Sequence, residues 1–127
     1  MDRQRIIEKL GLVSDGAFRV MDMHMVDWGR HIIFACEYQT VTLDGIPDDP
    51  IMFNMVLRDC REIKYRVYAH IAAHEQGIVT KSADMAELNF GKGNHRKDMH
   101  MLTNHFSISV SYGEFVIERG ELSFDFN

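Results

Sequence analysis

Residues 105–126 read HFSISVSYGEFVIERGELSFDF, and this stretch sets the fold class. Apolar and polar side chains alternate from His105 to Tyr112, and turns at Gly113 and Gly120 separate two further short apolar runs. Alternation with a period of two is typical of a β-strand with one buried face. Strands joined by turns this short must pair antiparallel, because a parallel pair needs a long crossover.

The same alternation recurs upstream, and we expect six to eight strands in all. It is clearest over 62–73, where every second residue is apolar and is predicted to face the core. Further strands are expected in three places: 18–25, 31–43 and 51–58. The last of these is apolar on both faces, with Met52 and Val56 on the second face. We therefore expect it to be a central strand, covered on both sides, with Val56 buried.

The N-terminus has helical periodicity instead. Asp2 is a suitable N-cap, and three apolar residues then share one helical face: Ile6, Ile7 and Leu10. A helix of about three turns is not stable alone, so residues 1–13 should pack on a β-rich body formed by 17–126. We predict one mainly β, α+β domain over 1–127, an antiparallel sheet (sandwich or open barrel) with one N-terminal helix.

Residues 78–101 do not show a single period. Ser82 is a suitable cap for a helix over 82–88, whereas 86–90 fits a strand equally well. A second helix here would cover the sheet. Without it, the second face of the sheet would expose more apolar surface than a monomer normally tolerates, and a second copy would be expected to bury it.

Composition excludes several classes of protein. Apolar residues make up 46% and charged residues 26% of the 127, which is typical of a globular domain. The longest apolar run, 32–36, is too short for a membrane helix, and no secretion signal is recognisable. Two cysteines cannot form a disulfide framework. We expect a cytoplasmic protein without a membrane partner.

The net charge of −5 makes nucleic acid an unlikely main partner, because phosphate neutralisation needs a basic face. The charge is unevenly distributed: 22–60 has an excess of acids, 61–100 has more bases than acids, and 101–127 is acidic again. A weaker alternative is single-stranded nucleic-acid binding on a strand face with two basic residues and an aromatic one: Lys64, Arg66 and Tyr68.

The segment 91–97, GKGNHRK, is the candidate anion site. Backbone N–H groups beside glycines, together with basic side chains, can converge on a phosphate or carboxylate. The order of residues does not match the phosphate-binding loop, which needs Lys-Ser/Thr after the second glycine. The candidate ligand-binding residues are four from this loop and two histidines: Lys92, His95, Arg96, Lys97, His70 and His105.

Metal and nucleophile signals are weak. His70 and His74 share a strand face but lie ~13 Å apart along it, too far for one metal ion. Cys36 lies in an apolar strand and Cys60 in a turn, neither with the signature of an activated thiolate, and no Gly-x-Ser-x-Gly motif is present. We expect no metal ion and no cofactor, and the sequence does not identify a catalytic residue.

Nine methionines are unusual for this length, and three of them alternate: Met21, Met23 and Met25. Such a stripe either faces the core or contributes to an interface with an adaptable partner. We predict a non-enzymatic binding or interaction module that self-associates as a homodimer. A small anionic ligand or a protein is the other expected partner. The main alternative is an enzyme or anion-binding protein that uses the 91–97 loop with nearby histidines.

Overall fold

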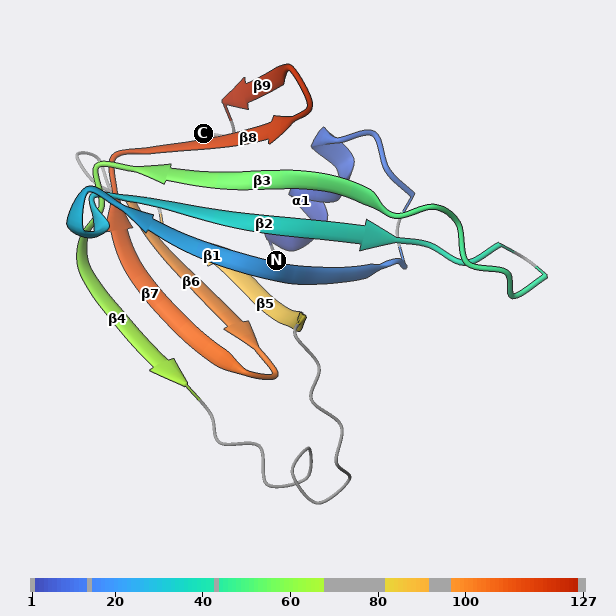
Figure 1. The fold of residues 1–127 in the computed structure, drawn as a ribbon, viewed down its shortest axis with the longest axis horizontal. Helices are drawn as coiled ribbons and strands as arrows, with labels where there is room; N and C mark the ends of the chain where they lie inside the picture. Colours follow the sequence, from blue (N-terminus) through green and yellow to red (C-terminus); the bar gives the residue numbers. More distant parts are fainter. Residues whose placement is uncertain (1, 14, 43, 68–81, 92–96, 126–127) are drawn as a thin grey trace.

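The computed structural model describes residues 2–13, 15–42, 44–67, 82–91 and 97–125 (Figure 1). In these ranges it contains one α-helix, α1 (Asp2–Lys9), a short 3-10 helix, η1 (Asp27–Gly29), and nine strands. The strands are β1 (Ala17–Val26), β2 (His31–Gln39), β3 (Ile51–Arg58), β4 (Arg61–Val67), β5 (Ala83–Phe90), β6 (Lys97–Thr103), β7 (Phe106–Tyr112), β8 (Glu114–Arg119) and β9 (Leu122–Asp125).

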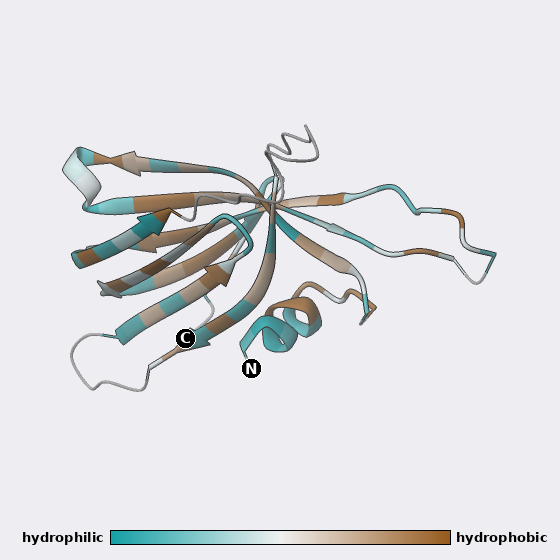
Figure 2. Ribbon diagram, turned by 90° about the horizontal axis from the view of Figure 1, so that it is seen from below, coloured by the Kyte–Doolittle hydropathy of each residue, from teal (hydrophilic) through white to brown (hydrophobic). Residues whose placement is uncertain are grey.

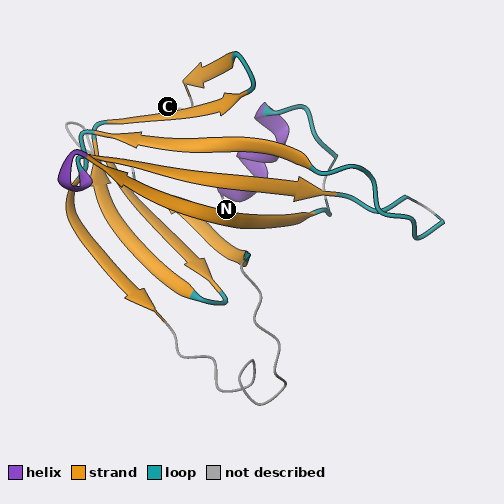
Figure 3. Cartoon of the chain, in the orientation of Figure 1, coloured by secondary structure: helices purple, strands orange, loops and turns teal. Residues whose placement is uncertain are grey.

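The nine strands form one antiparallel sheet in the order β4-β7-β6-β5-β1-β2-β3-β8-β9. Two groups of strands diverge from the end where η1 lies: β1, β2, β3 and β8 in one direction, and β4, β5, β6 and β7 in another (Figures 1 and 3). The prediction of a mainly β, α+β fold with an N-terminal helix is confirmed, although the strands number nine instead of six to eight. No helix in the described ranges is both long and apolar enough to cross a membrane.

The core lies on the inner face of this curved sheet. Strand pairing places Phe34, Met55 and Ile117 side by side in one row, and all three side chains are buried. The alternating apolar and polar bands along the strands are visible in Figure 2, where α1 lies against this face. Ile6 and Ile7 on α1 are fully buried there, as their helical spacing predicts.

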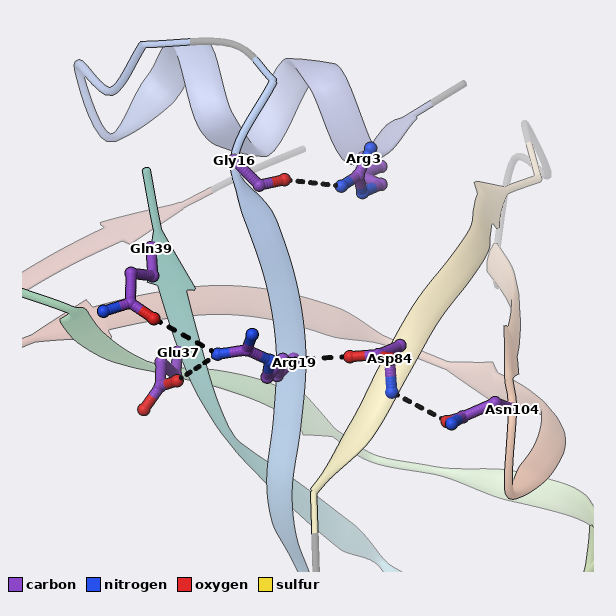
Figure 4. Close-up of polar contacts among 7 residues, drawn as sticks. All are labelled: Arg3, Gly16, Arg19, Glu37, Gln39, Asp84 and Asn104. Carbon is purple, nitrogen blue, oxygen red and sulfur yellow. Dashed lines mark hydrogen bonds and ion pairs between the residues drawn. The ribbon is translucent and has the colours of Figure 1, made fainter. Parts of the chain in front are cut away.

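Polar contacts fix the N-terminal end of α1. One carboxylate oxygen of Asp2 accepts a hydrogen bond from the backbone N–H of Phe90 at 2.7 Å, and the other pairs with Arg5. Asp2 therefore links the helix to the end of β5 in addition to lying at the helix start. Arg3 donates to the backbone oxygen of Gly16 at 3.1 Å, just before β1 (Figure 4).

Within the ambiguous segment, residues 83–90 form a strand, not a helix. β5 buries Ala83, Met85 and Leu88, which do not all fall at alternate positions. The reason is an irregularity in its pairing with β6 between Met85 and Glu87, which shifts the side-chain parity by one residue. The period of two is therefore broken in the sequence although the strand is continuous. Of the two alternatives for this segment, the strand is therefore found over 83–90, and the helix over 82–88 is not.

The outer face of β3 is only partly covered. Val56 is 5% exposed, as predicted, and its neighbour Val116 on β8 is also buried, although neither belongs to the inner core. Met52 on the same face is 53% exposed. Val56 and Val116 are therefore shielded within one chain, and they do not need a second copy to bury them. Self-association stays a prediction, but this face no longer supports it.

β4 is much less buried than its alternation predicts. It spans Arg61–Val67, and the remainder of the expected strand, 68–73, lies outside the described residues. Tyr65 and Val67, both predicted to face the core, are 47% and 65% exposed. The cause is position: β4 is the terminal strand of the sheet and pairs with β7 alone among the described strands.

Candidate functional site

β1 is paired with β5 over only a small part of its length. β1 pairs with β5 at only two positions, Arg19 with Asp84 and Val20 with Ala83. The register with β2 then shifts between Val20 and Asp22, leaving one extra residue as a bulge. A bulge bends its strand and increases its twist. Beyond this point β1 follows β2 and, within the described ranges, pairs with nothing on its other side.

Polar contacts hold the sheet together at the edge of this opening (Figure 4). Arg19 on β1 pairs with Glu37 on β2 at 2.9 Å and with Asp84 on β5 at 3.5 Å. The backbone N–H of Asp84 donates to the side-chain oxygen of Asn104, in the turn between β6 and β7, at 2.8 Å. The strands are therefore tied together where the opening begins.

The opening contains a hollow of about 300 Å³, which we name the β1 hollow. Its walls come from β1, β4, β5 and β7 and from the turn that precedes β7. The lining residues are Val20, Met21, Asp22, Met23, Tyr65, Ala83, His105 and Phe106. Cavities that bind small molecules usually have about this volume or more, with mostly apolar walls and a few polar groups.

Two aromatic rings and two flexible thioethers make up half of the lining residues. The rings of Tyr65 and Phe106 lie with their centroids 5.6 Å apart and their planes at 40°. Met21 and Met23 come from β1. Methionine adapts its shape to irregular contacts and packs favourably against aromatic rings. These residues therefore suit a small apolar or aromatic ligand.

Two polar groups lie at the rim. The carboxylate of Asp22 accepts a hydrogen bond from the backbone N–H of Met23 and lies 2.9 Å from the His24 ring nitrogen. His105 is held by the buried hydroxyl of Thr103, which accepts from the backbone N–H of His105 at 3.1 Å. The same hydroxyl donates to the carbonyl of Phe106 at 3.0 Å and thereby fixes the turn.

The structure describes only two of the six predicted ligand-binding residues, Lys97 and His105, and it does not bring these two together. Lys97 begins β6, whereas His105 follows its other end, so the length of β6, about 20 Å, separates them. The other four candidate residues lie outside the described residues: His70, Lys92, His95 and Arg96. His105 instead shares the β1 hollow with Met21 and Met23, which the sequence suggested as interface residues. Met25, on the same strand, is exposed.

A second, polar hollow of about 330 Å³ lies on the outer face of β4, β6 and β7. There the His100 ring nitrogen lies 2.8 Å from the hydroxyl of Ser109, on the adjacent strand. Sequence reasoning missed this pair, because it depends on the β6–β7 register. Lys64 lines the same hollow as Glu62 and Asp98, so its basic charge is not part of a continuous basic surface. This arrangement does not favour nucleic-acid binding.

Neither cysteine is an exposed nucleophile. Burial raises the pKa of the Cys36 thiol well above its usual range, so the thiolate is disfavoured. Cys60 is also buried, and its thiol lies near the backbone oxygen of Leu57. Among the described residues, no group of three or more His, Cys, Asp or Glu side chains lies close enough to hold a metal ion.

We expect that metal removal leaves stability unchanged. A specific metal ion present at 100 times its dissociation constant would stabilise the fold by about 2.7 kcal/mol. Melting curves recorded with EDTA and with added zinc, nickel or calcium should therefore coincide within about one degree. A chelator-sensitive shift of several degrees would contradict this expectation.

Comparison with known proteins supports the fold alone. No protein-family model matches the sequence, and no curated protein is similar enough to match it. The structure is similar to the crystal structure of an uncharacterized protein from Neisseria gonorrhoeae, with a TM-score of 0.54 and 10% sequence identity. The similarity covers 84% of this chain and 93% of that one.

Proposed function

We propose that this protein is a non-enzymatic binding module that takes a small, mainly apolar ligand into the β1 hollow. The observation that carries the proposal is that β1 stops pairing with β5 at Val20, beside its bulge, where the ring pair of Tyr65 and Phe106 lines the same hollow. Apolar groups left accessible in a concave site gain free energy when a ligand displaces water from them.

The residues of the hollow also indicate the charge of the ligand. None of the eight lining residues is lysine or arginine, and Asp22 lies at the rim. The whole chain carries a net charge of −5. A neutral or cationic aromatic compound therefore suits the hollow better than an anion does. The alternative of an anion site or enzyme centre in the 91–97 loop with nearby histidines falls mostly outside the described residues, and its two described members, Lys97 and His105, lie at opposite ends of β6.

The proposal is tested with the neutral fluorophore N-phenyl-1-naphthylamine, whose emission rises in apolar surroundings. We expect saturable binding to the wild type, and Met21→Trp should raise the dissociation constant at least about tenfold by filling the hollow. Met52→Trp is the matched control, because Met52 is exposed on the outer face and lines no part of the hollow.

Two results would contradict this proposal. One is the absence of saturable binding to the folded wild type. The other is equal binding by Met21→Trp and Met52→Trp, which would place the fluorophore elsewhere. Circular dichroism of each variant establishes that it is folded before its binding is compared.

A further inference from the structure

The two terminal strands of the sheet carry opposite charge. β4, at one end, has three basic residues and one acid: Arg61, Lys64, Arg66 and Glu62. The β8–β9 hairpin, at the other end, has four acids and one base: Glu114, Glu118, Glu121, Asp125 and Arg119. The uneven charge of the sequence therefore becomes a basic edge and an acidic edge of one sheet.

On both edge strands, charged or polar side chains lie on the outer face of the sheet and alternate with apolar side chains on the other face. On β4, Lys64 and Arg66 lie opposite serines of β7 on the outer face, while Tyr65 lies on the inner side opposite Ile108. On β9, Asp125 and Ser123 share the outer face with Val116 and Glu118 of β8. Leu122 and Phe124 alternate with them. Both strands are largely exposed.

We propose that β4 of one copy pairs with β9 of a second copy, so that the sheet continues from chain to chain. An edge strand presents unpaired backbone N–H and C=O groups to a further strand. Pairing β4 with β9 places Lys64 or Arg66 on the same face as Asp125, and it places apolar residues together on the other face. Opposite charges across a strand pair are stabilising.

Pairing between identical edges is disfavoured by the same charges. Two β4 strands would bring Lys64 and Arg66 of both copies together, and two β9 hairpins would bring carboxylates together. The contact is therefore heterologous, and it closes into a ring or continues as an open chain. β9 has only four residues, so association should be weak, dependent on protein concentration and reduced by salt.

Charge exchange between the two edges tests this contact. Light scattering and sedimentation are measured over a concentration series at low and high salt. Arg66→Glu and Asp125→Lys should each raise the dissociation constant of self-association about tenfold. An equimolar mixture of the two variants should recover association, because the reversed β4 of one matches the reversed β9 of the other.

Matched controls change the same amount of charge away from both edges. Lys9→Glu and Glu8→Lys alter exposed positions on α1 and should leave self-association within about twofold of the wild type. The proposal is overturned if the wild type keeps the mass of one chain, 14.7 kDa, at every concentration in low salt. It is also overturned if the mixture associates no better than the separate variants. Both results are independent of ligand binding in the β1 hollow.

Discussion

Replacing Val56 by aspartate is expected to lower the free energy of unfolding by about 4 kcal/mol. Val56 is 5% exposed and is flanked by Ile33 and Val116 on the neighbouring strands. A carboxylate at this position would be removed from water, and no positively charged side chain is assigned to pair with it. Arg58, the closest cation along the same face, already pairs with two carboxylates, Glu114 and Glu118.

Met52→Asp is the matched control for this substitution. Met52 lies on the same strand and the same face but is 53% exposed, so the cost should stay within about 1 kcal/mol. Unfolding in urea is followed by circular dichroism, because the single tryptophan, Trp28, is fully exposed in the folded protein and reports little on unfolding. Equal stability of the two variants would mean that the outer face of β3 is open to water at Val56.

Gly16→Ala is expected to lower the free energy of unfolding by about 3 kcal/mol. An added Cβ at Gly16 would lie 2.5 Å from a ring carbon of Tyr38 and 2.8 Å from the backbone oxygen of Gln39. The ring cannot move freely, because Tyr38 is buried and its hydroxyl accepts from the backbone N–H of Gly16 and donates to the carbonyl of Val13. The substitution therefore disturbs the junction between α1 and β1.

Gly91→Ala is the control for this steric effect. The nearest atoms to a Cβ at Gly91 lie at 3.5 Å, which is an ordinary contact distance. Its effect on stability should stay within about 1 kcal/mol, measured in the same urea experiment. If Gly16→Ala lowered the free energy of unfolding no more than Gly91→Ala does, the close packing of Tyr38 against Gly16 would be contradicted.

The fold was predictable where the periodicity of apolar residues in a segment matches their burial in the folded protein. Ile6 and Ile7 are buried at helical spacing, and β7 to β9 follow the alternation and the glycine turns of 105–126. β5 was obscured because its bulge near Met85 breaks the period of two. The exposure of Tyr65 was not predictable, because alternation identifies a face but not whether anything covers it.

The candidate site was predictable only in fragments. Met21 and Met23 were noted for their spacing and His105 as a histidine, but no pattern in the sequence joins them. Their convergence depends on which strands are neighbours and on where β1 stops pairing with β5. The His100–Ser109 pair is different, since the register of a short hairpin would have identified it.

The methionines provide the most direct test of ligand binding in the β1 hollow. In protein labelled with ¹³C at the methionine methyl groups, N-phenyl-1-naphthylamine is added stepwise and each methyl resonance is followed by NMR. The account predicts saturable shifts of Met21 and Met23, with Met52 on the outer face unchanged. Unchanged Met21 and Met23 resonances at saturating fluorophore, or shifts confined to Met52 and other methionines outside the hollow, would contradict it.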